Sequence, residues 1–253
     1  MADVYIAFGS GGGSGTDTDP YLANTATRFD EIMRGIAADT HIHIGAGSFP
    51  TLGLRHFPGL PGIGTQHDNG THGWHVRSKW TITGAGEGLT IIKLDAWPSF
   101  VAGGTPSSKW AAMGSLANVS NVIIENLTVD GNWPNLNSPP VGVALHCVAC
   151  LNDGPITHRN LTITGFYGNV STGTECFALC CHSVTPADPQ ELQASWLAVF
   201  DHCTVHHGHG DYLVGIASFN GGPSIINGCN IYSETTTSKF RSSILEVTST
   251  ISR

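Results

Sequence analysis

Residues 201–213, DHCTVHHGHGDYL, concentrate side chains that transfer protons or bind metal ions. These thirteen residues include four histidines, two aspartates and one cysteine. If the segment begins as a β-strand, alternation turns Cys203 and Val205 inward and leaves His206 on the outer face. The glycines within residues 207–211 predict a turn that exposes their neighbours. The chemistry available here is acid/base catalysis or metal binding.

Metal binding is the less favoured of these two chemistries. His202, His206, His209 and Asp211 offer ligands that suit zinc, copper or nickel. Neighbouring strand residues face opposite ways, however, and no His-x-x-x-His spacing on a helix fixes the geometry. The seven cysteines do not form two well-spaced C-x-x-C pairs, and their odd number leaves at least one without an intrachain disulfide. We therefore expect no metal site, and cysteines that pack as small buried hydrophobes.

One helix and many short strands must position these residues. Residues 25–39, TATRFDEIMRGIAAD, carry apolar side chains at helical spacing, with Thr25 or Thr27 available as the N-cap. Later segments share an alternating polar–apolar pattern followed by a turn: KWTITGAG (79–86), NLTVDGN (126–132), NLTITGF (160–166), HCTVHHG (202–208) and, less clearly, GCNIYSE (228–234). Their irregular spacing favours a coil with fixed strands and variable loops.

Composition limits the classes of protein and partner. The chain has 253 residues, only 12% charged, with 32 glycines, which favours a single all-β domain over residues 1–253. Its net charge of -8 argues against nucleic acid as a partner, because phosphates would not be neutralised. The sequence predicts no membrane span and shows no basic leader at its start. We expect an extracellular or virion-associated protein.

The order of these segments resembles that of a known superfamily. The helix, HIHIGAGSFP (41–50), TITGAGEGLTIIKL (81–94) and VSNVIIENLTVDGN (119–132) are similar to the opening of right-handed parallel β-helix proteins, such as pectate lyases, polygalacturonases and phage tailspikes. The resemblance implies an all-β solenoid with a lead-in (1–24), a capping helix (25–39) and five to six coils (41–250). A jelly roll is the alternative, but its two-residue Asn-Gly or Asp-Gly turns are mostly absent.

In such a coil, one outward row of residues forms a surface along the long axis. Aligning the repeats predicts the row Thr83, Asp130, Thr164, His206 and Tyr232. Coils lie about 4.8 Å apart, so two coils separate the backbones of Asp130 and His206 by about 10 Å. An acid and an imidazole on one face are suited to acid/base work on a polysaccharide. The alternative is that Asp130, Gly131 and Asn132 simply form a turn.

The resemblance also implies roles for individual residues. GHGDYLVGIAS (208–218) is similar to the Gly-His-Gly segment of polygalacturonases, which makes His209 the assisting histidine, although the Asn-Thr-Asp and Asp-Asp motifs of those enzymes are absent. Pectate lyases imply calcium as the cofactor to consider, with a basic residue as catalytic base; the candidates are Arg159, Lys239 and Arg241. His41 and His43 alternate with isoleucines and are expected on the exposed face of the first strand.

These arguments define two sets of candidate residues. The candidate catalytic residues are Asp130, His206, His209 and Asp211. The candidate substrate-binding residues are Trp74, Trp133, Tyr232, Asp153 and Asp201. The two tryptophans are included because they lie in or near loops, where their rings could stack on sugars.

We expect a protein that binds, and cleaves as a lyase or glycoside hydrolase, an extracellular or cell-surface polysaccharide. The alternative is a non-catalytic structural or adhesive module. The chain stops just after a strand, at EVTSTISR, without a polar cap. Because uncovered strand edges tend to pair with other chains, either the sequence is truncated or another chain covers this end, and such a module is expected to form a homo-oligomer through it.

Overall fold

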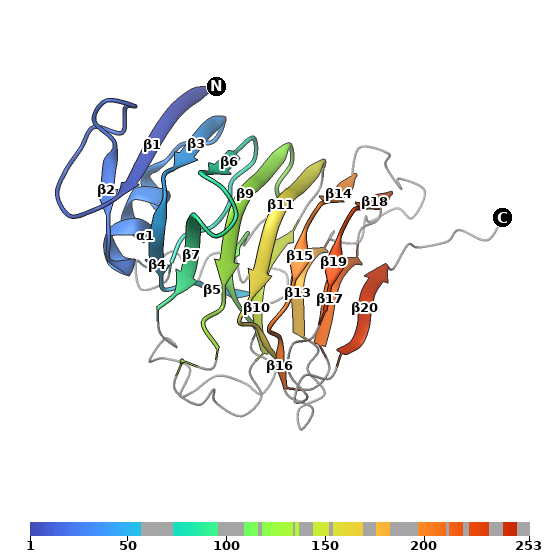
Figure 1. The fold of residues 1–253 in the computed structure, drawn as a ribbon. Helices are drawn as coiled ribbons and strands as arrows, with labels where there is room; N and C mark the ends of the chain where they lie inside the picture. The colour runs from blue at the N-terminus through green and yellow to red at the C-terminus, as the bar shows by residue number, and fades with distance from the viewer. Residues whose placement is uncertain are drawn as a thin grey trace.

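The structure, a computed structural model, describes residues 1–56, 73–95, 109–115, 118–133, 135–136, 144–151, 154–168, 176–182, 197–210, 213–219, 223–232 and 240–246. Within these ranges, strands β1 and β2 precede one α-helix, and the strands are stacked coil upon coil along a single axis (Figure 1). The strands pair in parallel except at two places described below. The parallel β-helix predicted from the sequence is therefore confirmed.

The described strands lie on three faces of the coil. The first face holds β2 (Tyr21–Ala23), β1 (Ala2–Phe8), β3 (Thr40–Ile44), β6 (Thr81–Gly84), the first halves of β9 (Val122–Asp130) and β11 (Ile156–Thr164), β14 (Ala198–Asp201) and β18 (Ser224–Asn227). The second face holds β4 (Gly47–Thr51), β7 (Thr90–Leu94), the second halves of β9 and β11, β15 (Thr204–Val205) and β19 (Asn230–Ile231).

The third face holds β5 (Leu54–His56), β8 (Lys109–Gly114), β10 (Ala144–Leu151), β13 (Cys176–His182), β17 (Leu213–Phe219) and β20 (Phe240–Glu246). Two short strands extend this sheet beyond β10: β12 (Tyr167–Gly168) pairs with β10, and β16 (His209–Gly210) pairs with β12. Among the described strands, only the pairs β5–β8 and β10–β12 are antiparallel.

A single residue with left-handed backbone turns the chain from the first face to the second. Asn126, Asn160 and His202 occupy this corner in successive coils, with φ of 57°, 48° and 53°. Asparagine and histidine enter this conformation more readily than most non-glycine residues. The Asn160 side chain donates a hydrogen bond of 2.9 Å to Asn126 Oδ1. The polar residue that opens the repeats at 126, 160 and 202 is thus a corner residue.

The helix α1 (Ala26–Gly35) covers the end of the first coils (Figure 1). The Thr25 hydroxyl accepts a 3.3 Å hydrogen bond from the Arg28 amide, which confirms Thr25 as the N-cap. Phe29 and Met33 are fully buried in the core. The helix is shorter than the predicted range of 25–39, because Ile36 already has extended backbone. No helix in the described part of the chain is long and apolar enough to cross a membrane.

The inward rows predicted from alternation form the core. The buried members, all 0% exposed, are Trp80, Ile82, Leu127, Val129, Leu161, Ile163, Cys203 and Val205. The corresponding residues of the last described coil, Cys229 and Ile231, are only partly buried. One continuous hydrophobic cluster joins these coils from Ile6 to Ile216.

The predicted alignment of the first repeat is wrong. Thr83 pairs with Glu125 on the first face, whereas Lys93 of β7 pairs with Asp130 on the second. Segments 81–84 and 90–94 both alternate, so the hydrophobic pattern fits either one to residues 126–132. The corner at Asn126 determines that segment 90–94 is the one that pairs with the second half of β9. This corner is a backbone conformation, which the alternation of polar and apolar residues does not reveal.

Candidate functional site

The second face carries the row of outward residues in which the predicted acid and imidazole lie. Strand register aligns Lys93, Asp130 and Thr164 in three successive coils. The row continues to His206, whose amide donates to Ile163 O at 3.0 Å, and to Tyr232, whose amide donates to Val205 O at 3.1 Å. Four of its five members are as predicted. The fifth prediction was wrong: Lys93, and not Thr83, occupies the first position of the row, because the corner at Asn126 shifts the alignment.

Asp130 holds a turn and an ion pair. Its Oδ1 accepts a 2.6 Å hydrogen bond from the Asn132 amide, and its Oδ2 lies 3.4 Å from Lys93 Nζ. The side chain is 20% exposed, so one part of the carboxylate remains accessible. The turn that the sequence analysis gave as the alternative for this segment is therefore present. The turn and the ion pair fix the orientation of the Asp130 carboxylate, which is therefore not a free surface group.

His206 and Tyr232 form the other end of this row. Their rings are nearly parallel, at 11°, with centroids 5.4 Å apart. The His207 ring lies 4.6 Å from that of His206. Thr164 stands between Asp130 and His206, which keeps the predicted two-coil separation of about 10 Å at the backbone.

Three rings from successive coils lie together where the chain leaves the second face. The Trp133 ring centroid is 4.4 Å from that of Tyr167 and 6.5 Å from that of His209. Tyr167 and His209 are directly paired between β12 and β16. All three side chains are only partly buried. We call these three residues the ring row; Trp133 and His209 are predicted site residues, whereas Tyr167 was missed.

The surroundings of His209 favour its neutral form. Burial, and then the neighbouring His207, lower the pKa of His209 from its ordinary value. A neutral imidazole has one hydrogen-bond donor and one acceptor, so it can both donate to and accept from the hydroxyl groups of a ligand. Its place beside Trp133 and Tyr167 is consistent with ligand binding.

Asp201 lies on a different face from Asp130. It belongs to a first-face row that consists of Tyr5, His43, Thr83, Glu125, Arg159, Asp201 and Asn227. Hydrogen bonds from Asn227, at 2.8 Å, and from His202, at 2.8 Å, lower its pKa. Arg159 lies 3.4 Å from both Asp201 and Glu125, so this candidate base for a calcium-dependent lyase is held between two carboxylates.

Trp74 is not a surface residue, and its predicted role in stacking on sugar is wrong. It is 2% exposed, and its ring lies 6.0 Å from Phe29 and 6.2 Å from Trp80. Its position beside a long loop suggested exposure, but its ring packs against Phe29 of α1 and against Trp80 in the core. Asp153 and Asp211, together with Lys239, lie outside the described residues. Of Arg241, in β20, only the backbone is described.

The sequence analysis also missed a cluster near the N-terminus. Asp3, His41 and His43 place their ligand atoms within 4.8 Å of one another, and they are the one such group in the described part of the chain. The two histidines were expected simply to face solvent. The available signal was the His-Ile-His alternation together with an aspartate in an earlier strand.

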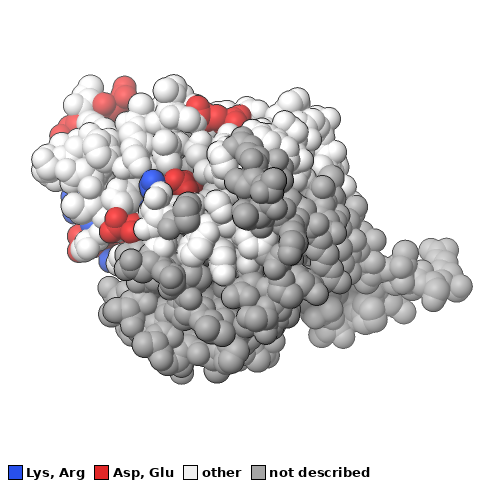
Figure 2. Space-filling model, turned by 60° about the horizontal axis from the view of Figure 1, so that its bottom comes forward, with Lys and Arg blue, Asp and Glu red and all other residues white. Residues whose placement is uncertain are grey.

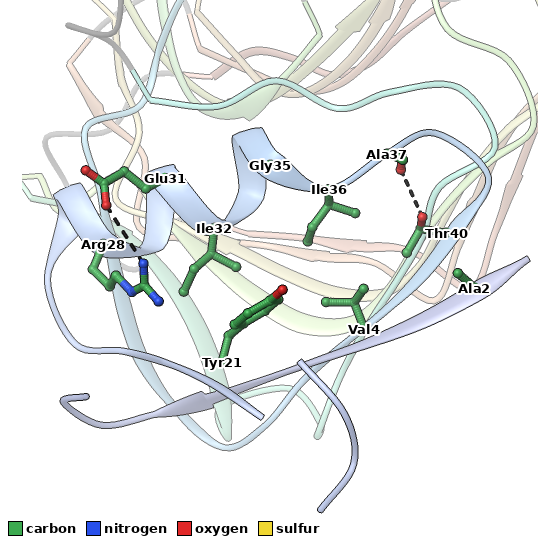
Figure 3. Close-up of a pocket in the computed structure, with 10 residues that line it drawn as sticks. All are labelled: Ala2, Val4, Tyr21, Arg28, Glu31, Ile32, Gly35, Ile36, Ala37 and Thr40. Atoms are coloured by element: carbon green, nitrogen blue, oxygen red, sulfur yellow. Dashed lines mark hydrogen bonds and ion pairs between the residues drawn. The ribbon is translucent and has the colours of Figure 1, made fainter. Parts of the chain in front are cut away.

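A cavity of about 370 Å³ lies between α1 and strands β1 and β2 (Figure 3). Val4, Tyr21, Ile32 and Ile36 give it apolar walls, and the Arg28–Glu31 ion pair, at 4.0 Å, lies at its edge. None of the predicted site residues lines it. Charged side chains are also sparse among the described residues in the view of Figure 2, as the composition predicts.

Comparison with known proteins finds a distant structural similarity. No protein-family model matches the sequence. No curated protein matches it either. Among solved structures, the chain is similar to a pectin methylesterase from Aspergillus niger in deglycosylated form, at 13% identity and a TM-score of 0.32. The match covers 97% of this chain and 86% of that one. The parallel β-helix rests on the strand register described above.

Proposed function

We propose that this protein binds an extended polysaccharide along its second face. The ring row carries this proposal: Trp133, Tyr167 and His209 come from three successive coils and lie together where the chain leaves the second face. Flat rings can stack on the apolar faces of sugars, and the tyrosine and histidine can also hydrogen-bond hydroxyls. We place such a protein outside the cell or on a virion, where these ligands occur.

The coil geometry supports a polymer as the ligand. Coils repeat at about 4.8 Å, so groups of one row recur at short, regular intervals along the axis. Solenoids use such extended surfaces for long ligands. Beyond the ring row, the second-face row adds the Lys93 ammonium, the Asp130 carboxylate and the His206 imidazole.

Binding can be tested with a panel of neutral and acidic polysaccharides in affinity electrophoresis. Trp133→Ala and Tyr167→Ala should each weaken binding of the retained polysaccharide by about tenfold, the loss of one stacking contact. Tyr5→Ala, which removes a ring from the first face, is the matched control and should bind normally. Retention of no polysaccharide, or equal retention by all variants, would refute the proposal.

Cleavage of the bound chain is the finer part of this proposal. It is supported by the presence of a carboxylate, an ammonium group and an imidazole in one row. Asp130 would act as acid or base, assisted by His206 and His209. Asp130→Asn keeps the acceptor for the Asn132 amide and should abolish cleavage without loss of circular dichroism. Unchanged product formation in Asp130→Asn would exclude this role and leave the binding proposal standing.

A structural module that self-associates is the second candidate function. The last described coil supports it, because Ile226, Cys229 and Ile231 are only partly buried and Ile225 is 49% exposed. Light scattering should show an oligomer that Ile225→Asp dissociates. Leu89→Asp, at a position 58% exposed in an earlier coil, is the matched control. A monomer at every concentration would rule out self-association.

A further inference from the structure

Asp3, His41 and His43 gather three metal-binding side chains at the N-terminal end of the first face. Asp3 lies on β1 directly opposite His41 on β3. His41 and His43 point outward on either side of Ile42, which is fully buried. The parallel register therefore brings Asp3 beside the two histidines, although nearly forty residues separate Asp3 from them in the sequence.

The spacing of the ligand atoms fits a small tetrahedral cation. Asp3 Oδ1 lies 3.0 Å from His43 Nε2 and 3.7 Å from His41 Nδ1. Ligands about 2.0–2.1 Å from a tetrahedral zinc ion are separated from each other by about 3.3 Å. The two distances lie on either side of this value. All three side chains are partly exposed, so small rotations would complete the geometry.

The hydrogen bonds around His41 leave its Nδ1 unprotonated beside the Asp3 carboxylate. The single proton of the Thr83 hydroxyl goes to Glu125 Oε1, 3.1 Å away, because a carboxylate only accepts. The same hydroxyl must then accept from His41 Nε2, at 3.0 Å, which places the ring proton on Nε2. The lone pair of Nδ1 in the neutral ring is thus directed toward Asp3 Oδ1. Two electron-rich atoms in this arrangement are stabilised by a cation between them.

Two contacts hold His43 beside the carboxylate. Its Nε2 is hydrogen-bonded to Asp3 Oδ1 at 3.0 Å, the same nitrogen that would bind the metal after its proton shifts to Nδ1. The Tyr5 ring stacks on His43 at 4.4 Å and 9°, which orients that imidazole. Ligands held by such neighbouring groups are typical of metal sites.

We propose that Asp3, His41 and His43 bind one divalent transition-metal ion of the zinc class, with Thr83 and Glu125 orienting His41. Two imidazoles and one carboxylate favour zinc, nickel or copper over calcium or magnesium. Three protein ligands leave a fourth tetrahedral position for water or a ligand group. This site lies on the first face and is independent of the proposed polysaccharide surface.

The experiment uses untagged full-length protein, dialysed against EDTA and titrated with zinc chloride by calorimetry. We expect one strong site per chain that depends on this cluster. Asp3→Asn and His43→Gln should each weaken it by at least about tenfold. Substituting cobalt for zinc should give the intense visible absorption of a tetrahedral centre in the wild type, and this absorption should be lost in both variants.

Two further variants separate binding from nonspecific effects. Asp201→Asn removes half of another aspartate–histidine pair on the first face, at 2.8 Å, and should leave zinc binding unchanged. Thr83→Val keeps all three ligands but removes the orienting hydroxyl, so zinc affinity should fall by about tenfold while the circular dichroism is unchanged. The proposal is overturned if the wild type shows no saturable zinc binding, or if Asp3→Asn and His43→Gln bind zinc as tightly as it does.

Discussion

His158 is an ionisable side chain placed entirely inside the coil. It is 0% exposed, its Nε2 lies 3.2 Å from Cys181 Sγ, and its ring stacks on Phe200 at 5.5 Å. Its Nδ1 has no hydrogen-bond partner within the described part of the chain. Burial lowers its pKa to about 3. Between about pH 3 and pH 6.5, this imidazole is therefore neutral in the native protein but protonated in the unfolded chain.

This burial predicts a specific sensitivity to acid. The unfolded chain binds the proton near pH 6.5 and the native state near pH 3, so the stabilisation is complete above pH 6.5 and is lost as the pH falls. Within that window the free energy of unfolding should decrease by up to about 1.4 kcal/mol per pH unit. His158→Leu should flatten this decrease in urea unfolding measured at several pH values. Phe49→Leu, which alters the core without removing a titratable group, should keep the wild-type slope.

The cysteines give a second prediction at the residue scale. Six of the seven are buried, and Cys229 is only partly buried. The neighbouring Cys203 thiol lowers the pKa of Cys229, which favours the reactive thiolate. Iodoacetamide at neutral pH should therefore modify Cys229 first in the native protein, as peptide mass spectrometry would show. Earlier modification of a buried cysteine such as Cys147 would contradict this.

At the scale of elements, the corner between the first and second faces sets the path of each coil. The left-handed backbone of Asn126, Asn160 and His202 allows one strand to continue around the core without a loop. The Asn160–Asn126 hydrogen bond joins two such corners. Placement of the groups on either side, such as Glu125 and Asp130, depends on this bend.

The corner predicts different effects for two substitutions of Asn160. Asn160→Ala should lower the free energy of unfolding by about 1–2 kcal/mol, because a Cβ is strained in this conformation. Asn160→Gly also removes the side-chain hydrogen bond but fits the backbone, so it should cost less. Urea unfolding of both variants checks the order. Equal losses would show that strain at the corner is unimportant.

The alternation of polar and apolar residues predicted the inward rows and most of the second-face row. This was possible because successive strand residues point to opposite sides of the sheet regardless of loop length. It did not locate the corner, which is why Thr83 was aligned with Asp130 in place of Lys93. Trp74 was misplaced because position beside a loop does not reveal burial. The cluster of Asp3 with His41 was missed because it depends on β1 pairing with β3, within a segment treated as a lead-in.

At the scale of the whole molecule, the first coils and the last described coil differ in how completely their apolar side chains are buried. The first coils are sealed by α1, with Phe29 and Met33 fully buried. In the last described coil, Ile226 and Ile231 are partly exposed. Because each coil contacts mainly its neighbours, local stability should vary along the axis.

This difference predicts a gradient of hydrogen exchange. Amides of β9 and β11 should exchange more slowly than those of β18 and β19, since the outer coil can open while the central coils stay paired. Exchange followed by mass spectrometry under native conditions would measure it. If all these amides exchanged at one common rate, the coil would open only as a whole.

The order β2–β1–β3 on the first face bears on how the protein is made. The first strand of the chain is hydrogen-bonded to β2 on one side and β3 on the other, so it is an inner member of its sheet. Each later strand of that face is added on the β3 side in the order of the sequence. Strands β1 and β3 can thus serve as a template for β6 while synthesis continues, and the ladder grows in the direction in which the ribosome delivers the chain.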